Sequence, residues 1–142
     1  MSASVRRAVR PAMVPWAERL PAPPRRNDEE LLHRAVLAYL RLALPADAIC
    51  WHTPNGGLRS KRVAQRLNGM GVLAGFPDLA ICWRGKLICI ELKTDRGVVS
   101  PAQREAHRVL LYCGAEVMVC RSAAECEAQL REMGIPLRAS VA

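Results

Sequence analysis

The sequence predicts an α/β fold in which a small mixed sheet is covered by helices. Three observations support this class: an apolar stripe of helical period near residue 36, short apolar runs of strand length, and helix-capping signals in the second half of the chain. The expected order is helix, three strands, helix, strand, helix. With 142 residues, 51% of them hydrophobic, the chain is long enough to bury the core of one such domain.

The first helix is expected to begin at a cap formed by Asn27 or Asp28 and to end near Leu44, because Pro45 cannot continue it. Its apolar residues recur every three or four positions, as in a helix that packs on a sheet: Leu32, Val36, Tyr39, Leu40 and Ala43. The next segments are interpreted as a strand at 48–53, a loop at 54–57 and a short basic helix at 60–68.

The second half of the chain continues with strands at 78–83 and 86–93 and a helix that Ser100 caps. Gln103 completes a capping box in that helix, and Gly114 ends it. A fourth strand at 116–120 should run parallel to the strand at 86–93, because a crossover helix joins them. The last helix shows similar signals in Ser122, Glu125 and Gly134.

Three segments differ in composition. Residues 1–26 form a basic, proline-rich arm that is expected to be disordered, residues 27–135 the folded domain, and residues 136–142 a C-terminal tail. The arm holds six Arg and one Glu, so it carries +5 of the formal net charge of +8. Net charge by itself is therefore a weak argument that the folded domain binds nucleic acid.

Several classes of protein are excluded by the pattern of charges and cysteines. The longest segments without a charged residue have 11 residues, whereas a transmembrane helix needs about 20. Pro11 and Pro15 interrupt the apolar stretch that a signal peptide would need. The six Cys show no C-x-x-C spacing, so we expect reduced core residues rather than disulfides or a zinc site.

The predicted hairpin brings two acidic residues together. If Arg84-Gly85 is a two-residue loop, paired residue numbers sum to 169, and Asp78 stands opposite Glu91 with Cβ atoms about 4.5–5.5 Å apart. Lys93 lies on the same face as Glu91 because side chains alternate along a strand. Both faces of the hairpin are otherwise apolar, so helices should cover both.

Two facing carboxylates at an apolar edge repel each other and require compensation. The compensation could be a salt bridge with Lys93 or a divalent cation, and spacing alone favours neither. Ligands that are all oxygen suit Mg²⁺ or Mn²⁺. Lys93 stands out because the chain has 18 Arg and only 3 Lys, and lysine, unlike arginine, can lose its proton when its pKa is lowered.

The first helix offers a third carboxylate. Glu29 shares the apolar stripe and should point toward the sheet, whereas Glu30 lies with His33 and Arg34 on the wetter face. Both acids also fit the ordinary role of complementing the helix dipole.

A basic segment lies between Asp47 and Asp78, where no acidic residue occurs. Its candidates for contact with a phosphate backbone are Asn55, Arg59, Lys61, Arg62 and Arg66. The alternative is a solvated helix face. Gln103 and His107 are one helical turn apart, but we expect His107 to be an exposed helix residue, and neither His33 nor His52 is a stronger candidate for catalysis.

Gly75-Phe76-Pro77-Asp78, then twelve intervening residues and Glu91-Leu92-Lys93, resembles the signature of the PD-(D/E)xK nuclease superfamily. Further motifs resemble its virus-type replication-repair nuclease (VRR-NUC) domain, in the form common in phages and prophages. They are His52-Thr53-Pro54-Asn55-Gly56-Gly57, Arg59-Ser60-Lys61-Arg62, Met70-Gly71-Val72 and Ser100-x-x-Gln103, and the resemblance covers about residues 28–130.

This resemblance implies a restriction-endonuclease-like fold, which agrees with the order of elements predicted above. It also implies that Asp78, Glu91 and the backbone carbonyl of Leu92 bind the metal, that Lys93 is the catalytic lysine and that Gln103 supports the site. Glu29 would be the helix acid, although the family often has Gln where this chain has His33.

The resulting expectation is an Mg²⁺- or Mn²⁺-dependent enzyme that hydrolyses DNA phosphodiester bonds in the cytoplasm of a bacterial or phage-infected cell. Relatives include junction-resolving enzymes and enzymes that nick or degrade ends. Junction cleavage would require two active sites and therefore a homodimer. The alternatives are a catalytically silent nucleic-acid-binding module, against which the intact Asp78, Glu91 and Lys93 argue, and a structural domain whose acids pair with Lys93.

Overall fold

The computed structural model describes residues 26–54 and 61–142. These residues form four helices and four strands, in the order α1 (Arg26–Ala43), β1 (Ala48–His52), α2 (Lys61–Gly69), β2 (Leu79–Trp83), β3 (Lys86–Leu92), α3 (Pro101–Tyr112), β4 (Glu116–Cys120) and α4 (Ala123–Glu132). All but the last residue of the predicted arm, and the predicted phosphate contacts Asn55 and Arg59, lie outside the described residues.

The strands form one mixed sheet in the order β1-β2-β3-β4. β1, β2 and β3 are antiparallel neighbours, and β4 is parallel to β3, as the crossover through α3 predicts. The turn between β2 and β3 has positive φ at both Arg84 (47°) and Gly85 (79°), the backbone of a type I′ hairpin turn. Trp83 therefore pairs with Lys86, which is the predicted register.

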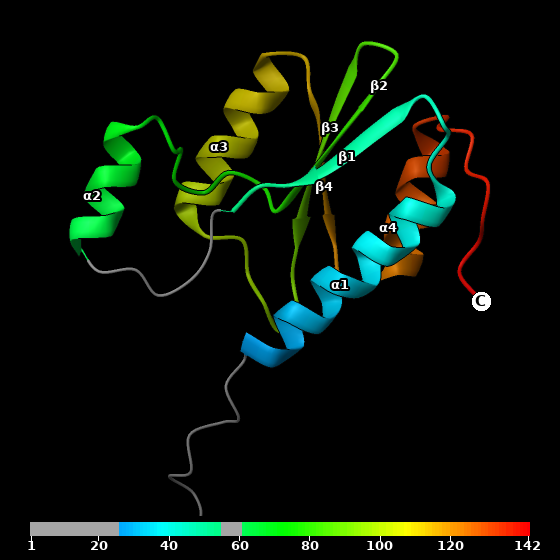
Figure 1. Cartoon of the computed structure of the whole chain (residues 1–142), viewed down its shortest axis with the longest axis horizontal. Coiled ribbons are helices and arrows are strands. Elements are labelled where there is room, and N and C mark those ends of the chain that lie inside the picture. The colour runs from blue at the N-terminus through cyan, green and yellow to red at the C-terminus, as the bar shows by residue number, and fades with distance from the viewer. Residues whose placement is uncertain (1–25, 55–60) are drawn as a thin grey trace, which may run out of the picture.

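Helices cover both faces of the sheet, and this confirms the predicted fold class (Figure 1). α1 and α4 lie on one side and α3 lies on the other. The core between the sheet and the first pair of helices is built from apolar residues at alternate strand positions, which include Leu79, Ile81, Ile88 and Ile90, with Leu40 from α1 and Leu130 from α4. The opposite strand positions, Glu91 among them, face α3.

Helix ends follow the predicted signals with two exceptions. Ser100 and Gln103 form the complete capping box at α3. At α4 the Ser122 hydroxyl accepts from the Glu125 backbone N–H, but the Glu125 carboxylate accepts from the Arg121 N–H, so the predicted second box is incomplete. α1 begins at Arg26, which places Asn27 and Asp28 inside its first turn rather than at a cap.

The C-terminal residues lie against α1 and α4. The Arg138 N–H donates to the Ala43 carbonyl over 2.7 Å, and the Tyr39 hydroxyl donates to the Ala139 carbonyl over 3.2 Å. The Val141 N–H donates to the Glu127 carboxylate. In the described part of the chain, no helix has the length and apolar character that a membrane span requires.

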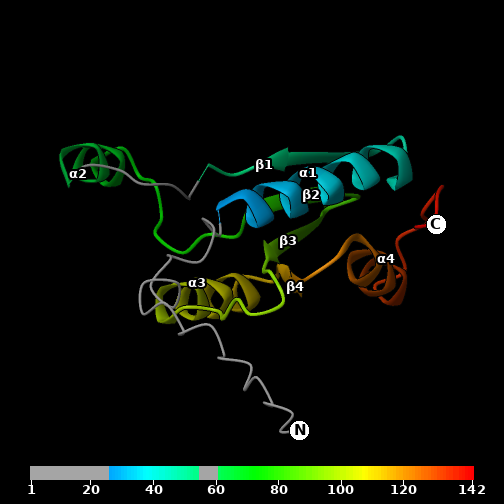
Figure 2. The same ribbon diagram turned by 90° about the horizontal axis from the view of Figure 1, so that it is seen from below.

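α2 lies apart from the rest of the described chain (Figure 2). None of its residues is buried, and Lys61, Arg62 and Arg66 are all exposed on it. The segment that follows α2 returns to the sheet at Gly75, where the chain passes very close to α3. A Cβ at this position would lie 2.5 Å from the carbonyl carbon of Ala102, so only glycine fits without displacement of backbone. This contact places the residues before β2 beside the start of α3.

Candidate active site

Asp78 and Glu91 meet where β2 begins and β3 ends. The ladder between β2 and β3 ends with the pair Leu79 and Ile90, so the next residues along the two strands are Asp78 and Glu91, as the predicted register requires. Asp78 is half-buried, and its Oδ2 accepts a hydrogen bond of 2.8 Å from the Leu92 N–H. The Asp78 side chain is thus tied to the strand that carries Glu91.

Glu91 is the buried charged residue at the centre of this group and is only 2% exposed. Gln103 Nε2 donates to its Oε1 over 2.7 Å, and Lys93 Nζ lies 3.5 Å from the same oxygen. His107 Nε2 lies 3.5 Å from the other oxygen, Oε2. Gln103 has two functions here, because its own Oε1 accepts from the Ser100 N–H in the capping box.

The electrostatic balance at Glu91 is unfavourable to its ionised form. Burial and, to a lesser extent, the neighbouring Asp78 carboxylate raise the pKa of the Glu91 carboxyl to about 7, although the Lys93 ammonium acts to lower it. The net direction is upward although Lys93 is near. A salt bridge to Lys93 therefore does not fully compensate for the two facing carboxylates.

Asp78 and Glu91 bring two carboxylates together, although residues 26–54 and 61–142 contain no group of three or more His, Cys, Asp or Glu side chains arranged to hold a metal ion. Glu91 Oε2 is buried and has no hydrogen-bond partner among the described residues. It lies beside the half-buried Asp78 carboxylate, so carboxylate oxygens at this position can serve a hard cation such as Mg²⁺ or Mn²⁺. The residues that would hold it are Asp78, Glu91 and the carbonyl of Leu92, the ligands implied by the resemblance.

All three histidines of the chain lie next to the acidic pair. His52 Nδ1 is 3.0 Å from the Asp78 carbonyl oxygen, and the His33 ring packs edge-on against the His52 ring with centroids 4.5 Å apart. His107 is 12% exposed at its side chain. The expectation that His107 is an exposed helix residue was wrong, and so was the placement of His33 on the wetter face, because it is half-buried against β1.

Burial lowers the pKa of both His33 and His107, with the positive charges of His52 and Lys93, respectively, acting in the same direction. The signal that could have identified His107 is its spacing. It follows Gln103 by four residues, and residues four apart lie on the same helix face. Once Gln103 is placed at Glu91, His107 has to be near it.

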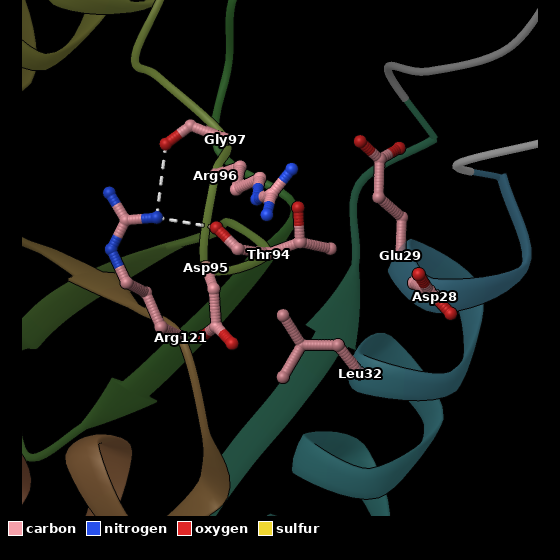
Figure 3. A pocket seen from close by; sticks show the side chains of 8 residues that line it. All are labelled: Asp28, Glu29, Leu32, Thr94, Asp95, Arg96, Gly97 and Arg121. Atoms are coloured by element: carbon pink, nitrogen blue, oxygen red, sulfur yellow. Dashed lines mark hydrogen bonds between the residues drawn. The ribbon is translucent and has the colours of Figure 1, made fainter. Parts of the chain in front are cut away.

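Glu29 and Glu30 are both exposed at the start of α1 but have different neighbours. Glu30 is exposed and accepts a hydrogen bond of 2.6 Å from Arg34 on the same helix. Glu29 lines a pocket of about 420 Å³ between the start of α1 and the loop 94–97 that follows β3 (Figure 3). The pocket includes Thr94, the residue after Lys93, but neither Asp78 nor Glu91.

Arg121 is a residue that the sequence did not single out. It follows β4, and its Nη1 donates to the carbonyls of Thr94 and Gly97, the second over 3.0 Å (Figure 3). The Lys93 N–H donates to the Cys120 carbonyl over 3.0 Å. These contacts fix the loop that leads from Lys93 to Gln103.

Comparisons with known proteins agree with the predicted fold. A family model described as the VRR-NUC domain matches residues 28–124. Among solved structures, the chain is similar to a "VRR_NUC domain protein" with a TM-score of 0.60 and 21% sequence identity, over 74% of this chain and 86% of that chain. At this identity the likeness shows the fold alone. No curated protein matches the chain.

Proposed function

The chain belongs to the VRR-NUC domain family, a nuclease-type family, and we propose that it is a metal-dependent nuclease that hydrolyses DNA phosphodiester bonds. The observation that carries the proposal is the buried carboxyl of Glu91, which lies beside Asp78, with Lys93 3.5 Å away and one oxygen without a partner. Such an arrangement destabilises the fold unless a cation or a substrate uses it.

The structural alternative, in which Lys93 merely neutralises the acids, predicts a lowered carboxyl pKa. The pKa of Glu91 is instead raised, first by burial and then by Asp78, despite Lys93. Asp78, Glu91 and the Leu92 carbonyl would hold a Mg²⁺ or Mn²⁺ ion, which would supply the missing positive charge and Lewis-acid polarisation of the phosphate.

The remaining side chains have distinct roles in this proposal. Lys93 places its ammonium beside the acids, where it stabilises negative charge that develops on the phosphate or orients the attacking water. Gln103 holds Oε1 of Glu91 by its 2.7 Å hydrogen bond, while Oε2 accepts no hydrogen bond from the described residues. Such supporting contacts orient a carboxylate ligand and tune its affinity.

DNA contacts come from the basic segment that includes α2. Lys61, Arg62 and Arg66 are exposed there and can each neutralise a phosphate; Asn55 and Arg59 belong to the same proposal on sequence grounds. The biological setting that we propose is phage replication, repair or recombination with junctions or flaps as substrates. Junction cleavage would further require a homodimer with two active sites.

The experiment is a cleavage assay with labelled four-way junction, flap, duplex and single-stranded DNA, each with Mg²⁺, Mn²⁺ or EDTA. Wild type is compared with Lys93→Ala and with the matched control Lys86→Ala, an exposed lysine at the other end of the same strand. We expect cleavage only with a divalent cation, its loss in Lys93→Ala and normal cleavage in Lys86→Ala. DNA binding without any cleavage by wild type would instead identify a silent binding module.

A further inference from the structure

Trp51 is an exposed aromatic residue on the same face of the sheet as the acidic pair. Side chains of β1 alternate between the two faces, and Ala48 and Cys50 pack against the core beneath α1 and α4. Trp51 therefore lies on the opposite face, toward α3. Its partner in the ladder is Ala80, which follows Asp78 by two residues and shares its face.

Trp51 is a near neighbour of Asp78 on this face. The Thr53 N–H donates to the Asp78 carbonyl over 2.8 Å, so these two residues stand opposite each other. Trp51 precedes Thr53 by two residues and is therefore the diagonal neighbour of Asp78. Diagonal neighbours across antiparallel strands are about 7–8 Å apart, which is within reach of an aromatic side chain.

The ring of Trp51 is available to a ligand. Trp51 is 42% exposed, and its indole makes no hydrogen bond, ring contact or cation–π contact within the described part of the chain. Trp83 differs, because its Nε1 donates to Asp47 over 3.0 Å and the guanidinium of Arg84 lies 5.2 Å from its ring centre. A large apolar surface thus remains in water beside the carboxylates, at the edge of the sheet.

Charge indicates what binds this surface. β1 leads directly into the basic segment, where no acidic residue occurs between Asp47 and Asp78 and where Lys61, Arg62 and Arg66 are exposed on α2. A basic surface attracts a phosphate backbone. Aromatic side chains beside such a surface bind nucleic acid by stacking on its bases, and every base has a face that can stack.

We propose that Trp51 stacks on an unstacked DNA base next to the cleaved bond and thereby selects branched or single-stranded DNA over continuous duplex. The inference rests on the proposed function, because the DNA is the substrate of the same site. A continuous duplex must first unstack a base to reach Trp51, whereas a flap presents an unpaired base without this cost. Trp51 determines specificity and takes no part in bond breaking.

The test uses the full chain in EDTA and a flap DNA that carries 2-aminopurine as the unpaired base at the branch point. The fluorescence of this base analogue falls when it stacks on an aromatic ring. We expect quenching by wild type and by Trp51→Phe, and its loss in Trp51→Leu. Trp83→Phe is the matched control at the far end of the hairpin, beside the turn, and should quench like wild type.

Affinity provides a second readout. Trp51→Leu should weaken binding of the flap by about five- to a hundredfold, the range for loss of one base–aromatic stack. Binding of a fully paired duplex of the same sequence should change little. An equal loss for flap and duplex would overturn the inference. So would 2-aminopurine that stays bright in the complex with wild type, a result that does not depend on whether Trp51→Leu folds.

A protein partner at the same surface would give a different result. Ile49, two residues before Trp51 on the same face, is also exposed. If Trp51→Leu and Ile49→Ser both turn an oligomer into a monomer in sedimentation while the quenching stays unchanged, the surface is an interface between copies of the chain and the inference is overturned.

The inference and the proposed function fail in different ways. Wild-type protein that cleaves DNA, with no loss of flap binding in Trp51→Leu, would overturn the role of Trp51 and leave the nuclease intact. Wild-type protein that neither binds nor cleaves DNA would overturn both.

Discussion

Replacement of Glu91 by glutamine is expected to stabilise the metal-free protein and to abolish cleavage. Glu91 is 2% exposed, and burial together with the neighbouring Asp78 carboxylate raises its pKa from 4.5 to about 7. Glutamine has nearly the same shape without the charge, and its carbonyl oxygen can still accept the hydrogen bond from Gln103. The substitution therefore removes a buried charge and keeps the packing.

The sign and size of the effect follow from proton linkage. A carboxyl whose pKa is raised on folding binds its proton more tightly in the folded chain, so the free energy of unfolding falls as the pH rises from 4.5 to about 7. Since one pKa unit corresponds to about 1.4 kcal/mol, ionised Glu91 destabilises the metal-free fold by about 3 kcal/mol. Glu91→Gln should recover up to this amount near pH 8 and almost none near pH 4.5.

The assay is urea unfolding in EDTA at about pH 5 and about pH 8. The quantity to compare is the difference between variant and wild type, because His33 and His107, whose pKa values are lowered by burial, give the wild-type protein an opposite slope. Glu116→Gln, an exposed position on β4, is the matched control. A variant less stable than wild type near pH 8, or a difference that does not change with pH, would refute the reasoning.

A divalent cation should reverse the order of the two proteins. Wild type gains about 2.7 kcal/mol at a free Mn²⁺ or Mg²⁺ concentration one hundred times its Kd, because the ion binds the folded chain. Glu91→Gln lacks one carboxylate ligand and should gain little. Equal stabilisation of both would show that Glu91 does not bind the ion.

Other substitutions test the rest of the site. Lys93→Arg should fold and bind DNA but cleave poorly, because the guanidinium keeps its charge and spreads it over a larger fork; normal rates would make Lys93 a simple positive charge. Glu29→Gln should lower the cleavage rate about tenfold and the apparent affinity for the divalent cation about tenfold, whereas Glu30→Gln should only lose its exposed ion pair with Arg34, worth about 0.2–0.5 kcal/mol of stability. The measurement is a titration of the cleavage rate with Mg²⁺, and the reverse result would assign the helix acid to Glu30. Arg121→Met should lower the free energy of unfolding by about 2 kcal/mol, because its hydrogen bonds to the loop carbonyls are lost. In the same urea titration, the control Arg104→Met at an exposed position should change this free energy little. Equal free energies of unfolding for the two variants would mean that the loop does not depend on Arg121.

Local chemistry was enough to predict the acidic pair. The period of a strand is two residues and the Arg84-Gly85 turn is two residues long, so the pairing of Asp78 with Glu91 follows by counting from the turn. The cap at Ser100 is equally local, because its hydrogen bonds join residues three apart. Such features involve neighbours in the chain, and no tertiary contact has to be known.

Contacts between distant segments decided the surroundings of that pair. His33, His52 and His107 come from α1, β1 and α3, and the packing of these elements on the sheet brings them to Asp78 and Glu91. Nothing in their local sequence distinguishes them from solvated histidines. The Arg121 contacts arise in the same way, since they join residues 24 and 27 positions apart. Only the packing of the helices on the sheet determines which side chains surround the carboxylates, because the orientation of a helix on a sheet depends on the summed burial of its apolar face and not on any one residue.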